Sequence, residues 1–141
     1  MKGRVCFLFL LLCLGCSHKP KAPTVSAGLV DSGRSVRFTG LDYAIVSELG
    51  RDSSKGIWQV LIPVFRMPAD TDLKTYQPVQ PGTYKLIDSA IVFTPDTPFV
   101  KGHAYFMRYY RFSGNDNMWD YIRGKSKLGR VPYTDLVFNI R

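Results

Sequence analysis

The sequence predicts an all-β protein, an antiparallel β-sandwich that follows an N-terminal signal and a short tether. Short apolar segments, several of them alternating, are separated by turn-forming clusters such as "GRDSSKG", "QPGTY" and "FSGNDN". Strand candidates do not alternate with helix candidates, so the βα order of a parallel sheet is missing. Only "LDYAIVSEL" and "WDYIRG" could be helical, and neither is long enough to carry a fold.

Two strands are expected in the first half of the domain. Residues 34–40 alternate, with Val36 and Phe38 on one side. Residues 56–67, "GIWQVLIPVFRM", are expected to form a long strand because the run is rich in β-branched and aromatic residues. Pro63 predicts a bend in this strand, because proline cannot donate a ladder hydrogen bond. The two faces of the strand would carry, respectively, Trp58, Val60, Ile62 and Val64, and Leu61, Phe65 and Met67.

Four further strands are expected in the second half. Residues 82–88 and 89–95 are expected to form two short strands, and residues 103–112 a long one. Residues 134–141 close the sandwich. In this last strand the inward side chains are Leu136, Phe138 and Ile140.

The N-terminus predicts export from the cytoplasm. Residues 5–14 are ten consecutive apolar residues, preceded by Lys2 and Arg4. A membrane-spanning helix needs about 20 residues, so this run is too short to span and is typical of a secretory signal. The alternative, a buried core helix, is disfavoured because the run shows no polar face of helical period.

The end of the signal, "LCLGC", resembles the lipobox of bacterial lipoproteins, with Gly15 and Cys16 at its last two positions. The family usually has Leu where this chain has Cys13, and often Ala or Ser where it has Leu14. The resemblance implies that Cys16 is lipidated and becomes the first mature residue; ordinary secretory cleavage would instead leave it as a free thiol. Ser17, in place of the Asp that favours inner-membrane retention, implies the periplasmic face of the outer membrane.

These features divide the chain into a signal peptide of residues 1–15, a tether of residues 16–24 and one β-sandwich domain of residues 25–141. Cys6 and Cys13 would leave with the signal, so the folded part has no disulfide and no thiol metal site. The formal net charge of +8 becomes +6 without Lys2 and Arg4. A basic surface suits an anionic membrane, and an exported protein is not expected to bind nucleic acid.

The stretch "IVFTPDTPFVKGHAYFMRYY" resembles the end of immunoglobulin-like and fibronectin-type domains; a transthyretin-like sandwich is the alternative. The resemblance implies that Tyr105 is the corner tyrosine, with its ring in the core and its hydroxyl bonded to backbone. Phe106 points to the opposite face of the strand, so we expect Tyr105 to be the more buried of the two.

No enzymatic activity, metal or cofactor is expected. His103 is the only histidine of the folded part, and no serine lies in a nucleophile-elbow pattern. The loop acids, among them Asp70 and Asp72, are typical of solvated turns. The oxygen-rich stretch "SGNDNMWD" departs from the EF-hand spacing and does not predict a calcium site.

The long connection "NDNMWDYIRGKSKLGR" carries the predicted partner contact. Its aromatic residues could plug an open end of the sandwich, form a protein-contact site, or stack on a sugar. Tryptophan, tyrosine and arginine are enriched at binding hot spots, which supports a contact. For Trp119 itself the plug is the preferred interpretation, and the surrounding basic loop is the expected contact surface. The candidate contact residues are Trp119 and Tyr121 with a basic rim of Arg123, Lys125, Lys127 and Arg130.

The order of strands, the later tryptophan and the lipidated cysteine together resemble, over about 80 residues, small outer-membrane lipoproteins of type VI secretion machines. The resemblance implies a non-catalytic structural or assembly lipoprotein with a protein partner in the cell envelope. The alternative is a ligand-binding module for a glycan or a lipid headgroup.

Overall fold

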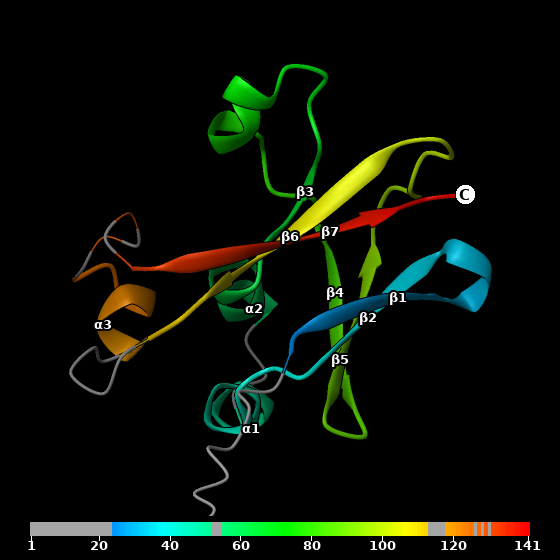
Figure 1. Cartoon of the computed structure of the whole chain (residues 1–141). Coiled ribbons are helices and arrows are strands. Elements are labelled where there is room, and N and C mark those ends of the chain that lie inside the picture. The colour runs from blue at the N-terminus through cyan, green and yellow to red at the C-terminus, as the bar shows by residue number, and fades with distance from the viewer. Residues whose placement is uncertain (1–23, 52–54, 113–117, 126, 128, 130) are drawn as a thin grey trace, which may run out of the picture.

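The computed structural model describes residues 24–51, 55–112, 118–125, 127, 129 and 131–141. Two antiparallel sheets dominate this part of the chain, which confirms the predicted sandwich-like all-β fold (Figure 1). The four-stranded sheet contains, in spatial order, β1 (Ser26–Val30), β2 (Ser35–Thr39), β5 (Ala90–Pro95) and β4 (Gly82–Ile87). The three-stranded sheet contains β3 (Val64–Arg66), β6 (Ala104–Tyr110) and β7 (Tyr133–Asn139).

In the described residues, five short helices connect the strands. The 3₁₀ helices are η1 (Asp31–Gly33), in the β1–β2 hairpin, and η2 (Thr71–Tyr76), between β3 and β4. The α-helices are α1 (Tyr43–Arg51), α2 (Lys55–Leu61) and α3 (Met118–Ile122). Helices α1 and α3 overlap "LDYAIVSEL" and "WDYIRG", which confirms the two helical stretches expected from the sequence. Figure 1 shows α3 at one end of β6 and β7 and the C-terminus at the other.

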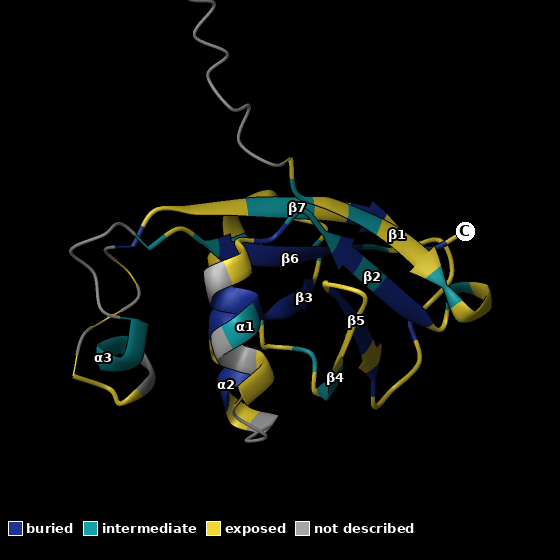
Figure 2. Cartoon of the chain, turned by 90° about the horizontal axis from the view of Figure 1, so that it is seen from below, coloured by how far each residue is buried: buried dark blue, intermediate teal, exposed yellow. Residues whose placement is uncertain are grey.

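The core lies between the inner faces of the two sheets. Figure 2 shows that β2, β3, β5 and β6 are largely buried, whereas the edge strands β1 and β4 are more exposed. Aromatic rings join the sheets: Phe38 of β2 packs edge-on against Phe138 of β7, with ring centroids 6.0 Å apart. Phe99, in the β5–β6 connection, contacts Tyr105 at 4.7 Å and Phe138 at 5.7 Å. These contacts close the sandwich across its middle.

The expectation of one long strand over residues 56–67 is wrong in its first half. These residues form α2, and β3 begins only after Pro63, where the bend was predicted. Ile57, Trp58 and Leu61 are buried while Val60 is exposed, which is the spacing of one helix face and not the alternation of a strand. Burying that face against the core outweighs the β propensity of the side chains.

The predicted placement of Tyr105, with its ring in the core and its hydroxyl bonded to backbone, is confirmed. The prediction that Tyr105 is more buried than Phe106 is wrong. Tyr105 is 2% exposed, and its hydroxyl accepts a hydrogen bond of 3.0 Å from the Val100 backbone N–H. Phe106 is 0% exposed. Its face of β6 is covered as well, because Phe65 stacks on its ring at 5.0 Å and the Lys74 ammonium lies 4.6 Å from the ring centre.

Substitutions at Tyr105 test this corner. Tyr105→Ala should lower the free energy of unfolding by about 3–5 kcal/mol, because a buried ring is lost. Tyr105→Phe keeps the ring and should lower it by about 1 kcal/mol through the lost hydrogen bond. Tyr76, which is 81% exposed, supplies the matched control Tyr76→Phe, expected to be neutral. Urea unfolding measures all three, and a parent-like midpoint for Tyr105→Ala contradicts the assignment.

Candidate functional site

A pocket of about 670 Å³ opens at the end of the sandwich near Thr24, the first described residue. Its walls come from the first residues before β1, from the start of α1 and from the ends of β6 and β7 that meet α3. The apolar part of the lining consists of Val25, Ile45, Phe112 and Leu136. This volume lies within the range of about 300–1,000 Å³ that small-molecule sites occupy.

The backbone around Gly40 brings the two ends of the β1–β2 hairpin together at the pocket. Gly40 has a φ of +75°, and a Cβ on this residue would collide with the carbonyl oxygen of Thr24. Only glycine allows both the positive φ and the close approach. Thr24 therefore forms part of the pocket wall, just before β1.

Tyr109 and Arg111 provide polar groups on the strand side of the pocket. They lie two residues apart along β6 and its extension, so they point to the same face. The buried Tyr109 hydroxyl accepts a hydrogen bond of 3.0 Å from the Asp42 backbone N–H, at the start of α1. Burial raises the pKa of the Tyr109 phenol, so it remains protonated and its own O–H can still donate.

Arg111 is held in place through its backbone. Its N–H donates a 2.8 Å hydrogen bond to the carbonyl oxygen of Pro132, which continues the β6–β7 ladder beyond the last paired residues. Within the described residues the guanidinium has no hydrogen bond or ion pair. The pocket thus combines an apolar wall with an exposed arginine at its margin.

Helix α3 adjoins this pocket. Phe112, which lines the pocket, contacts the ring of Tyr121 with centroids 5.4 Å apart. Met118 and Trp119 are half-buried and pack against the main core cluster. This packing supports the covering role for Trp119, the first of the three roles considered from the sequence.

The basic residues after α3 are exposed. Arg123 and Lys125 donate backbone hydrogen bonds back to Trp119 and Asp120, at 2.9 and 2.8 Å, so the turn is fixed to the helix. Lys127 follows, also exposed. That these cations meet a partner stays a prediction. Arg130 and Cys16 lie outside the described residues.

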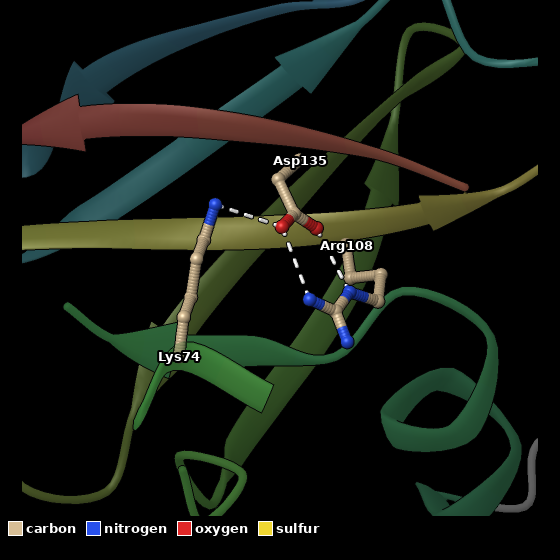
Figure 3. A network of polar contacts seen from close by, with 3 residues as sticks. All are labelled: Lys74, Arg108 and Asp135. Atoms are coloured by element: carbon tan, nitrogen blue, oxygen red, sulfur yellow. Dashed lines mark hydrogen bonds and ion pairs between the residues drawn. The ribbon is translucent and has the colours of Figure 1, made fainter. Parts of the chain in front are cut away.

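A second polar cluster lies on the outer face of the three-stranded sheet (Figure 3). Arg108 of β6 forms a bidentate ion pair with Asp135 of β7, with Nε–Oδ1 at 2.8 Å and Nη2–Oδ2 at 3.0 Å. Lys74 reaches down from η2 to the same carboxylate at 2.8 Å. The Arg108 guanidinium also lies 4.0 Å from the ring centre of Tyr133.

This cluster is structural in character. Burial by itself raises the pKa of Asp135, but hydrogen bonds from Arg108 and Lys74 outweigh it, and the net shift is downward. Arg108 is only 7% exposed and its charge is compensated in place. This cluster was not predicted from the sequence, although the single arginine inside the apolar run "YFMRYY" was a signal for a buried ion pair.

His103 and the loop acid Asp70 make local contacts within the fold. The Arg66 guanidinium lies 3.1 Å from His103 Nε2, and because arginine can only donate, the ring nitrogen is the acceptor. Asp70 accepts a 3.0 Å hydrogen bond from the Asp72 backbone N–H and begins η2. Among the described residues no group of three potential metal ligands is found, and most of the oxygen-rich stretch, residues 113–117, falls outside them.

Comparisons with known proteins give no match. No family model matches the sequence, no curated protein resembles it significantly, and no solved structure matches the fold. In the part of the chain that the structure describes, no helix has the length and hydrophobicity to cross a membrane.

Asp135→Asn tests the buried cluster. The change leaves the Arg108 charge buried without its partner and should lower the free energy of unfolding at pH 7 by about 3 kcal/mol. Because folding lowers the pKa of Asp135, its contribution is full above the unfolded value, near 3.9, and is lost as pH falls through the lower folded value. The difference in the free energy of unfolding between the parent and Asp135→Asn should therefore shrink below about pH 4. Asp88→Asn, an exposed turn position, is the control, and equal unfolding of both variants and parent at pH 7 would refute the account.

Proposed function

We propose that the protein is a lipid-anchored, non-catalytic interaction module at the periplasmic face of the bacterial outer membrane. It binds a protein partner of the cell envelope, such as a component of an envelope-spanning secretion complex. The anchor is Cys16, for which the signal and the lipobox-like residues of the sequence argue. The binding surface is the basic end of the domain, which we define as Arg123, Lys125 and Lys127 with the adjoining helix α3.

The observation that carries this proposal is the arrangement of α3. A half-buried tryptophan fixes the helix on the core, and three exposed cations follow within eight residues of it. An ordered, positively charged surface speeds encounter with an acidic partner and selects against basic ones. The backbone of Arg123 and Lys125 is hydrogen-bonded to α3, so these two residues need little ordering on binding.

The position of the tether supports the same surface. Thr24 lines the pocket, Phe112 lines it too, and Phe112 contacts Tyr121 of α3. The tether and the basic end therefore lie on the same side of the domain. Seven residues lie between Cys16 and Thr24, and the eight Cα–Cα steps of a fully extended chain span at most roughly 30 Å. A partner would meet this surface close to the bilayer.

The alternative function, a ligand-binding module for a glycan or a lipid headgroup, is favoured by the pocket itself. The pocket has the volume of a small-molecule site and mixes an apolar wall with a few polar groups. The two functions are compatible, because the pocket adjoins the basic end without including its cations.

Site-specific photo-crosslinking in cells tests the protein contact. A photoreactive residue in place of Lys127 should yield one discrete protein adduct. The same residue in place of Lys101, an exposed position beside the C-terminal end of β7, is the matched control and should yield none. Reversing the charges with Arg123→Glu and Lys125→Glu should reduce the adduct about tenfold, since like charges oppose the encounter.

Two outcomes count against the proposal. An adduct from Lys101 but not from Lys127 would place the partner at the opposite end of the domain. An adduct at Lys127 that survives both charge reversals would show that the basic end is not the recognition surface.

A further inference from the structure

The pocket beside Thr24 carries charges of both signs at its margin. Arg111 and Asp42 both line it, from the end of β6 and the start of α1, and both are exposed. Tyr43, next to Asp42, also lines the pocket, and its ring is 75% exposed. A carboxylate beside an exposed aromatic face is a chemistry that attracts ammonium groups. An arginine fork is the matching chemistry for a phosphate.

The interior of the pocket differs from its margin. Val25, Ile45, Phe112 and Leu136 make an apolar wall, and Tyr109 adds a buried ring with one hydroxyl proton still able to donate. A neutral sugar presents many hydroxyl groups that all need partners, and this wall provides few. An alkyl chain needs none and gains about 0.8 kcal/mol for each buried methylene.

We propose that this pocket binds a zwitterionic phospholipid, with part of an acyl chain against the apolar wall. Its phosphate meets Arg111 and the Tyr109 hydroxyl, and its ammonium group meets Asp42 and the face of Tyr43. The Asp42 carboxylate has two oxygens with several acceptor sites, so it can receive the ammonium in addition to other contacts. This inference deepens the ligand-binding alternative and rests on the proposed membrane location, which keeps the pocket within the reach of the tether.

The charges at the pocket select between lipid classes. An anionic lipid would satisfy Arg111 but bring a negative charge toward Asp42, and a cationic amphiphile would do the reverse. A zwitterionic headgroup matches both signs at once. The basic residues Arg123, Lys125 and Lys127 do not line the pocket and would act only on the surrounding surface.

Photolabelling in a defined bilayer tests the proposal. The mature protein, lipidated at Cys16, is placed in nanodiscs of phosphatidylglycerol with a small fraction of phosphatidylethanolamine that carries a diazirine in its acyl chain. After irradiation, peptide mapping should find the label in the pocket segments around Ile45, Phe112 and Leu136. Unlabelled phosphatidylethanolamine should compete, and additional phosphatidylglycerol should not.

Substitutions separate the pocket from the surrounding surface. Arg111→Gln should reduce pocket labelling about tenfold, because it removes a charge-assisted hydrogen bond to the phosphate. Arg141→Gln, the same change at an exposed position near the opposite end, should leave labelling unchanged. Asp42→Asn keeps a residue suited to begin a helix, and should weaken the competition by phosphatidylethanolamine relative to phosphatidylglycerol.

Three results overturn the proposal: label outside the pocket segments only, equal competition by the two lipids, or parent-like labelling of Arg111→Gln. All three labelling results are measured in nanodiscs that contain no protein partner. Loss of the crosslink at Lys127 in cells would therefore count against the protein contact alone, and pocket labelling would remain a separate result.

Discussion

The contact of Phe99 with both sheets is the constraint on which the rest of the structure depends. Phe99 sits in the β5–β6 connection and touches Phe93 of one sheet and Tyr105 and Phe138 of the other. The Tyr105 hydroxyl holds the next residue, Val100, by its backbone N–H. The crossover is thereby fixed at the point where the chain passes between sheets. With the sheets joined there, α1 and α2 can cover the remaining open side of the core.

Strand β6 links that core to everything proposed about function. One face carries Tyr105 and Tyr109, and the other carries Phe106 and Arg108, so both faces are buried. The outer face is covered by η2 and held by the ion cluster on Asp135 (Figure 3). The inner face leads through Tyr109 to the pocket. Strand β6 therefore connects the ion cluster on its outer face with the pocket at the end of its inner face.

Local sequence patterns predicted much of the fold and little of the site. The last four strands follow from alternation and turn residues, which act over a few positions, whereas the corner tyrosine was implied by the resemblance to immunoglobulin-like domains. The long strand failed because a short apolar run can be helix or strand, and only burial of Ile57 and Leu61 decides it. The pocket could not be predicted, since its walls come from segments around residues 24, 42, 111 and 136 that only tertiary folding brings together. The sequence pointed to Trp119, but the pocket beside it depends on Gly40 and Arg111.

The central claim is that a lipid anchor at Cys16 keeps the pocket and the basic end of the domain close to the bilayer. Mass spectrometry of the protein extracted from bacterial membranes tests it most directly, through the intact mass and the N-terminal peptide. The account predicts a mature chain that begins at Cys16 and carries a thioether-linked diacylglycerol, with the signal of residues 1–15 absent. A chain that begins elsewhere, or an unmodified Cys16 in the membrane-associated protein, would contradict it.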